Sequence, residues 1–351
     1  MRAVTARGGW IWGLSGLATA AVLAVPAVRL VAHPGLRGDP AIPSATLTRT
    51  ITLSQPITSV NVASPGEPVR VVAGSGPDVR VTEVLSYAKP DGPPKVQVSA
   101  AGGHLSLAAP ACITGDCGVS FTVTVPAAVL ATVTSSGGPV TVSGVAGAHV
   151  DSGGAPVTLR NIHGPLTVAT DGGGLGLSGQ TGEVHADTGG GPMAAAGIDG
   201  QTTISTDGGP LSVTGLTGPL EADSGGGPAY LFDVTAQTAT VTTGGGAGRL
   251  QFDAAPGSVV LSTDGGPAQL DVPAGPYALT SDSDGGPEAV TIATSPSASR
   301  TLAVTSGGGL LQVDHATGIR SHQALKPIEN PKGPTVPPAP NKPQAPAAPK
   351  T

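Results

Sequence analysis

Seven aspartates in this sequence stand one or two residues before a glycine pair, and they are the first candidates for chemistry. If the glycine-rich segments stack on one another, these side chains form a row along one edge. Carboxylate oxygens are the ligands that calcium prefers. The seven residues are Asp151, Asp171, Asp187, Asp207, Asp223, Asp264 and Asp284.

Two features make calcium the weaker interpretation of this row. In calcium-binding β-rolls the repeated nonapeptide places its aspartate after the glycines, whereas here the aspartate precedes them, and the second turn of each segment usually has none. We therefore expect each Asp side chain to accept a backbone N–H inside its own turn. The separations from Asp151 to Asp223 alternate between 20 and 16 residues, which predicts paired coils that differ slightly at the corner.

Histidines in the same segments are a second candidate for metal or acid–base chemistry. His149 and His185 each stand two residues before one of the aspartates, and Glu221 takes the same place before Asp223. Two stacked coils would separate these side chains by about 9–10 Å, which is too far for them to share one metal ion. His163, in the other turn, has no such partner. We assign no catalytic, cofactor-binding or metal-binding residue and expect no cofactor.

The elements that must position these side chains follow from the spacing of the glycines. Ten glycine pairs occur between Gly137 and Gly307 at a mean spacing near 19 residues, and periods of this size indicate a solenoid. Each block holds two short alternating runs, such as 211–213 and 220–222, separated by a second turn at 214–219. Alternation with period two predicts strands, and no helical spacing of apolar residues occurs between Pro126 and Pro327.

We therefore predict an all-β fold, a parallel β-solenoid of short glycine-cornered coils, over residues 134–325. Glycine suits the corners because tight turns need positive φ. Few aromatic residues fit a narrow interior, and those of the solenoid (Tyr230, Phe232, Phe252, Tyr277) look thinly spread. The positions expected to point inward are Val157, Leu159, Leu166, Val168, Leu175, Leu177 and Val184.

The flanking segments differ from the repeat. Residues 48–133 contain alternating strands without glycine pairs, and we expect a small β subdomain that caps the first coil. Residues 29–47 form a linker. Residues 326–351 contain nine prolines, which predicts a disordered, polyproline-like tail.

The N-terminal region predicts export. Residues 8–28 carry no charge and are long enough for a transmembrane helix that acts as a signal anchor. Arg2 and Arg7 place residues 1–7 in the cytoplasm and the body of the chain outside. The alternative is a signal peptide cleaved near Val25-Pro26-Ala27, which would leave a secreted protein.

The two cysteines and the net charge agree with an exported protein. Cys112 and Cys117 are the only cysteines, and in an oxidising compartment we expect them to form a disulfide; two free thiols or a metal site are the alternatives. The net charge of −6 argues against a nucleic-acid partner.

The order of these parts resembles the bacterial putative-adhesin family, a domain of unknown function found in envelope proteins. The resemblance rests on the strand Phe121–Ala127 and on the repeats from Ser135 to about Val313. It implies a surface β-solenoid and supplies no catalytic residue.

These observations predict a membrane-anchored, non-enzymatic adhesin-like or scaffold module whose partners are cell-wall or glycan polymers. One alternative is an envelope-stress accessory protein that holds a membrane protein through residues 48–133. Another is end-to-end polymerisation through an uncapped end. A polysaccharide-active enzyme is the minor alternative, because β-helical enzymes build a cleft from long loops and every turn here is short.

Overall fold

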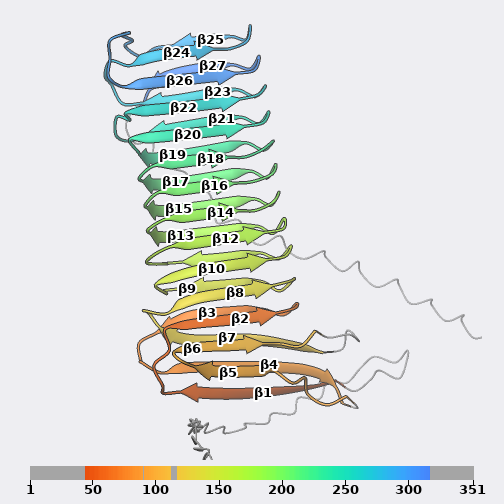
Figure 1. Ribbon diagram of the computed structural model, residues 1–351. Coiled ribbons are helices and arrows are strands. Elements are labelled where there is room, and N and C mark those ends of the chain that lie inside the picture. The colour runs from red at the N-terminus through yellow and green to blue at the C-terminus, as the bar shows by residue number, and fades with distance from the viewer. Residues whose placement is uncertain (1–43, 90, 112–116, 317–351) are drawn as a thin grey trace, which may run out of the picture. The chain divides into compact units, whose positions relative to one another are not determined.

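The computed structural model describes residues 44–89, 91–111 and 117–316. All regular structure in these residues is β-strand, and the strands form two sheets whose coils stack along one axis (Figure 1). Sheet A has 14 strands and sheet B has 13. Consecutive strands of the chain alternate between the sheets through most of the stack, so each coil contributes one strand to each sheet.

The strands of sheet A, in spatial order, are β1 (Ser44–Leu53), β4 (Val79–Ala88), β7 (Gly118–Pro126), β3 (Val69–Gly74), β9 (Val140–Ser143), β11 (Val157–Arg160), β13 (Leu175–Thr181), β15 (Met193–Asp199), β17 (Leu211–Thr217), β19 (Ala229–Thr235), β21 (Gly248–Phe252), β23 (Ala268–Val272), β27 (Leu311–His315) and β25 (Glu288–Val290).

The strands of sheet B, in spatial order, are β24 (Ala278–Asp282), β26 (Thr301–Ser306), β22 (Ser258–Thr263), β20 (Thr238–Thr243), β18 (Leu220–Asp223), β16 (Thr202–Ser205), β14 (Val184–Asp187), β12 (Leu166–Thr170), β10 (Gly147–Ser152), β8 (Leu130–Ser135), β2 (Ser59–Ser64), β6 (His104–Ala108) and β5 (Gln97–Ala101).

Neighbouring coils pair in parallel, as the sequence predicts. In the middle of the stack the register advances by 18 residues per coil: Val168 lies opposite Ala186, and Ala186 lies opposite Ile204. Because side chains alternate between the two faces of a strand, a constant register keeps one row of side chains facing inward along the whole stack. The parallel β-solenoid is therefore confirmed.

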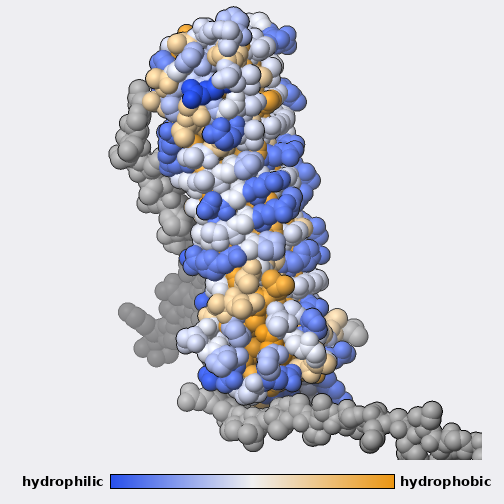
Figure 2. All heavy atoms as spheres, turned by 60° about the vertical axis from the view of Figure 1, so that its left-hand side comes forward, coloured by the Kyte–Doolittle hydropathy of each residue, from blue (hydrophilic) through white to orange (hydrophobic). Residues whose placement is uncertain are grey.

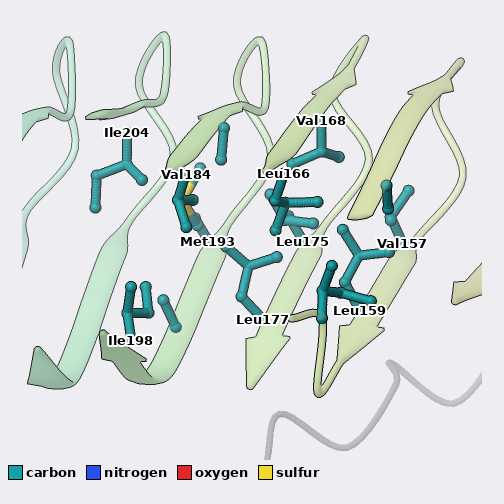
Figure 3. Close-up of a cluster of buried hydrophobic side chains, with 14 of the residues drawn as sticks. Val157, Leu159, Leu166, Val168, Leu175, Leu177, Val184, Met193, Ile198 and Ile204 are labelled. Atoms are coloured by element: carbon teal, nitrogen blue, oxygen red, sulfur yellow. The ribbon is translucent and has the colours of Figure 1, made fainter. Parts of the chain in front are cut away.

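The interior between the sheets is filled by aliphatic side chains (Figure 3). All seven residues expected to point inward are buried, with at most 3% exposure. Burial of apolar area is the main stabilising contribution of this fold, and each coil supplies only a few side chains to it. A single coil is therefore not stable by itself, and the stack is stabilised by contacts between neighbours.

The second turn is shorter than the sequence suggests. The turn expected at 214–219 begins later, because β17 continues to Thr217. Gly215 adopts a left-handed conformation, with φ of 68°, inside this strand. That local irregularity lets Leu216 point inward, where it is fully buried, instead of ending the strand.

The N-terminal strands are part of the same two sheets. Strand β2 pairs in parallel with both β6 and β8, and β3 pairs in parallel with both β7 and β9. Beyond them β1, β4 and β5 add antiparallel pairs. The region expected as a separate cap over 48–133 thus contains parallel solenoid coils as well as antiparallel edge strands, and the expected boundary at 133/134 falls inside β8.

A buried ion pair lies within these antiparallel strands. Glu83 on β4 points into the interior with its side chain fully buried, and Arg49 on the neighbouring β1 donates hydrogen bonds from Nε and Nη2 to Glu83 Oε2. A buried carboxylate is costly unless it is paired. Arg49, with a side chain 39% exposed, supplies that pairing at the end of the stack.

The C-terminal coils are out of sequence order. The coil formed by β26 and β27 lies between the coil of β22 and β23 and the coil of β24 and β25 (Figure 1). Strand β26 pairs in parallel with both β22 and β24. The last coil in the sequence therefore lies inside the stack, and the coil that precedes it in the sequence is the outermost one.

Candidate functional site

The corners that follow eleven of the thirteen sheet B strands are each built around a Ser or Thr hydroxyl, which is buried at nearly all of them. This Ser or Thr ends the strand or directly follows it, and its hydroxyl donates a hydrogen bond to the backbone carbonyl three residues later. Thr188 Oγ1, for example, lies 2.7 Å from the Gly191 oxygen. Eleven corners share this bond, those of Ser64, Ser135, Ser152, Thr170, Thr188, Thr206, Ser224, Thr243, Thr263, Ser283 and Ser306.

The glycines of a corner serve two different physical purposes. Gly208 has a φ of 133° and open space around it, so its position favours glycine for conformational reasons. Gly209 has no positive φ, but a Cβ at this position would lie 2.1 Å from the carbonyl oxygen of Gly191 on the preceding coil. The interpretation that all corner glycines serve positive φ is therefore wrong for this second position, where close stacking of coils excludes a side chain.

The seven aspartates lie at this corner but occupy two different positions. Asp151, Asp187 and Asp223 directly precede the buried hydroxyl, at or next to the end of their strands. Their register partners on the intervening coils are Ala169 and Ser205. The other four, Asp171, Asp207, Asp264 and Asp284, directly follow the buried hydroxyl. An 18-residue coil combined with this shift of two residues produces the alternating separations of 20 and 16.

This alternation separates like charges. The aspartates that directly precede the buried hydroxyl occur on every second coil, so neighbours in that row are about 10 Å apart. Oδ1 of Asp187 accepts the N–H of Gly189 at 2.8 Å, and Oδ1 of Asp223 accepts the N–H of Gly225 at 2.8 Å. The predicted turn-capping is confirmed at these two residues. At the other five sites the Asp side chain makes no such bond, although Asp282 Oδ1 accepts the N–H of Asp284.

Metal binding has little geometric support in the described part of the chain. Among residues 44–89, 91–111 and 117–316, no three His, Cys, Asp or Glu side chains are grouped closely enough to hold a metal ion. Calcium binding by the aspartate row stays a prediction for solution measurement.

The histidines are placed as the spacing predicts. His149, His185 and Glu221 share one outward row with Thr167 and Thr203 on the coils between them, so they are two coils apart. His185 Nε2 lies 2.9 Å from Glu183 Oε1, and the structure brings no second histidine to it. His163, at the opposite corner, contacts only Thr181 Oγ1 through its ring nitrogen, at 3.4 Å.

The aromatic residues are more organised than the sequence suggests. Phe121, Phe252 and Tyr277 are buried in the interior. Tyr230 and Phe232 lie two residues apart on β19 and both point outward from sheet A, where Tyr230 is 39% exposed. Because side chains alternate along a strand, the spacing of two residues between Tyr230 and Phe232 places both on one face. The expectation that the aromatic residues are thinly spread missed this signal.

Three further predictions concern residues outside the described part of the chain. Cys112 lies outside it, so the disulfide between Cys112 and Cys117 stays a prediction; no described cysteine is free. The transmembrane segment 8–28 and the tail 326–351 also lie outside. The residues that the structure describes include no helix long and apolar enough to cross a membrane.

Comparisons with known proteins give distant likenesses only. No protein-family model and no curated protein matches the chain. Among solved structures it is similar to a putative cell adhesion protein from Clostridium sporogenes (8% identity, 77% of this chain and 100% of that chain, TM-score 0.19). It is also similar to putative adhesins from Parabacteroides distasonis (11%, 77% and 97%, 0.35) and Parabacteroides merdae (13%, 76% and 95%, 0.32).

The names of these structures agree with the family that the sequence resembles. Their identities and TM-scores are too low to carry any conclusion about this chain. The class that its own fold defines is a parallel β-solenoid with two long, regular outer faces.

Proposed function

We propose that the chain is an exported, membrane-anchored binding module of a bacterial envelope that acts by adhesion and not by catalysis. The observation that carries this proposal is the regularity of the outer faces. On sheet B, Thr132, His149, Thr167, His185 and Thr203 stand on successive coils in one uninterrupted register. A surface that repeats along one axis can make many equal contacts with a partner that also repeats.

Short side chains make these faces suitable for weak, repeated contacts. Hydroxyl, imidazole and carboxylate groups donate and accept hydrogen bonds, and many such contacts along one polymer add up through multivalency without a deep pocket. Cell-wall and glycan polymers are repeating partners with matching hydroxyl groups. The uncharged segment 8–28 would hold the rod at the membrane, within reach of such polymers.

The surface is predominantly polar on the side seen in Figure 2, with apolar residues gathered toward the N-terminal end. The most exposed large apolar side chain in the described residues is Leu130, at 50%. This distribution suits a module whose long faces contact hydrated polymers.

The test is sedimentation of the purified full chain, kept in detergent, with purified cell-wall sacculi. We expect the folded chain to co-sediment and the heat-unfolded chain to remain in the supernatant. If the folded chain does not bind but a membrane protein co-purifies after crosslinking in cells, the envelope-stress role replaces this proposal. If neither is seen and electron microscopy shows filaments, end-to-end polymerisation replaces it.

A further inference from the structure

One outward patch of sheet A differs chemically from the rest of that face. Tyr230, Arg249, Gln269 and Gln312 are register partners on β19, β21, β23 and β27, so they form one row across four adjacent strands. Phe232 and Asp271 stand beside this row. We call these six residues the Tyr230 face.

The three preceding coils carry only small side chains at the same positions. The register partners of Tyr230 on the three earlier strands are Ser212, Ala194 and Gly176. The partners of Phe232 are Thr214, Ala196 and Ser178. The face therefore changes from small side chains to aromatic and planar polar ones within a single coil, at β19.

Arg249 holds the centre of the Tyr230 face in a fixed arrangement. Its guanidinium carbon lies 5.4 Å from the centre of the Phe232 ring, a favourable cation–π distance. Its Nη2 lies 3.3 Å from Asp271 Oδ2. Its Nε is buried and has no hydrogen-bond partner, so a polar donor at the centre of the patch remains unsatisfied, which is unusual in folded proteins.

The polar side chains around Arg249 are also held in place. Nε2 of Gln269 lies 3.4 Å from both carboxylate oxygens of Asp271. Nε2 of Gln312 donates to Asp314 on the same strand. Because these bonds use the amide nitrogens, the Oε1 atoms of both glutamines stay available as acceptors.

An exposed aromatic ring flanked by fixed amides and a guanidinium matches the chemistry of a sugar. The C–H groups on one face of a sugar ring pack against the electron-rich face of an aromatic ring, while its hydroxyls pair with planar amide, carboxylate and guanidinium groups. We propose that the Tyr230 face binds a neutral polysaccharide, with Tyr230 as the stacking platform and Gln269 and Gln312 as hydroxyl partners. This inference rests on the proposed function and locates its contact site.

Charge and composition distinguish this ligand from other classes. Asp271 compensates Arg249, and Asp314 adds a further negative charge, so an acidic polymer would be repelled. Cores of protein–protein interfaces are rich in apolar side chains. Strands β17, β19, β21 and β23 carry no exposed large aliphatic residue, and the two that lie near this end of sheet A, Val290 on β25 and Leu310 just before β27, are too few to form an apolar interface core.

The test is calorimetric titration of the detergent-purified full chain with neutral hexasaccharides of glucose, mannose and N-acetylglucosamine, and with hexagalacturonate as the acidic probe. We expect at least one neutral hexasaccharide to bind and hexagalacturonate not to bind. Tyr230→Ala and Gln269→Ala should each weaken binding about tenfold or more, as for residues at the centre of an interface. Tyr230→Phe, which keeps the ring, should retain most of the affinity.

The matched control is Ser212→Ala, which alters the same row one coil earlier and should bind like the original chain. Unchanged binding by Tyr230→Ala, preference for hexagalacturonate, or no binding of any neutral hexasaccharide would overturn the inference. If the chain still sediments with sacculi in that case, the proposed function survives and only the location and ligand class are wrong. If sedimentation also fails, the proposed function itself falls.

Discussion

Thr206 Oγ1 donates a hydrogen bond of 2.7 Å to the carbonyl oxygen of Gly209, three residues later, and Thr206 is 1% exposed. The hydroxyl also lies 3.2 Å from the Ser224 oxygen on the next coil. One side chain thus closes its own corner and contacts the corner stacked on it. Because the same bond recurs in eleven corners, it is a structural unit of the solenoid.

Replacing Thr206 with valine should destabilise the protein, because valine keeps the volume but leaves the Gly209 carbonyl without this donor. The expected loss is about 1–3 kcal/mol, the cost of a buried polar group left unpaired. Urea unfolding followed by circular dichroism measures it. Thr206→Ser should recover most of the loss, and Thr203→Val on the outer face should have little effect. Equal losses for Thr206→Val and Thr203→Val would contradict the assigned role.

Alanine at the two adjacent glycines of this corner should give different losses. Gly208→Ala forces an L-residue to φ of 133° in open space, at a cost of about 1–3 kcal/mol. Gly209→Ala places Cβ 2.1 Å from the Gly191 oxygen, so two coils must separate, and we expect a loss above about 4 kcal/mol or no folded protein. Thermal melting of both variants makes the comparison. A larger loss for Gly208→Ala would show that conformation, not coil spacing, determines this corner.

Alkaline pH should destabilise the fold through Tyr277. Its hydroxyl donates to the Pro273 oxygen at 2.8 Å, and burial raises the pKa of this phenol, while the positive charge of Arg300 partly opposes the shift. A raised pKa means that the folded state favours the neutral form. The resulting stability is complete below the ordinary tyrosine pKa of about 10 and is lost as the pH rises through that value and above it.

Melting temperatures of the original chain and of Tyr277→Phe between pH 8 and pH 11 test this effect. The original chain should be the more stable at pH 8, and its advantage should shrink above about pH 10. Other groups that ionise in this range are common to both proteins and cancel in the difference. A difference that stays constant across the range would show that Tyr277 is not responsible.

Calcium should have only a small effect on stability. Asp187 and Asp223 already accept backbone N–H groups, and alternate coils keep like charges apart, so no cation is needed to hold the corner. Melting in EDTA and in millimolar calcium should differ by only a few degrees. Asp187→Asn, which keeps an oxygen acceptor, should be tolerated better than Asp187→Ala. Collapse of the fold in EDTA would instead indicate a genuine calcium row.

A disulfide between Cys112 and Cys117 should appear in the exported protein. Closing so short a loop stabilises the fold by roughly 2 kcal/mol on the chain-entropy estimate, so reduction should lower the melting temperature slightly. Peptide mapping without reduction should recover both cysteines in one cross-linked product. Recovery of two alkylated thiols would identify them as free.

The fold could be predicted because its signals are local and repeated. Alternation such as Val157-Thr158-Leu159 determines which side chains face inward, and the glycine spacing determines the length of a coil. The hydroxyl at each corner was missed because Ser and Thr are common at outward positions too. Alternation places Thr206 on the inward side with Ile204, and Thr203 on the outward side, but the bond to a backbone carbonyl three residues later is visible only in the structure.

The order of the terminal coils could not be predicted. The sequence of residues 278–290 and that of residues 301–315 each predict an ordinary pair of strands. No local pattern predicts which of the two pairs lies outermost. That order depends on contacts between distant segments. The Tyr230 face was missed for the same reason, because Tyr230, Gln269 and Gln312 come together only when four coils are placed in register.

The inverted order of the last two coils has a consequence for biogenesis. Residues 278–290 leave the ribosome, and any export channel, before residues 301–315, yet β24 and β25 pair only with β26 and β27. In the folded solenoid these two strands have backbone partners only on the coil that follows them in the chain. The outermost coil therefore cannot take its place until residues 301–315 have been made, so the C-terminal end of the stack depends on a segment that is synthesised after it.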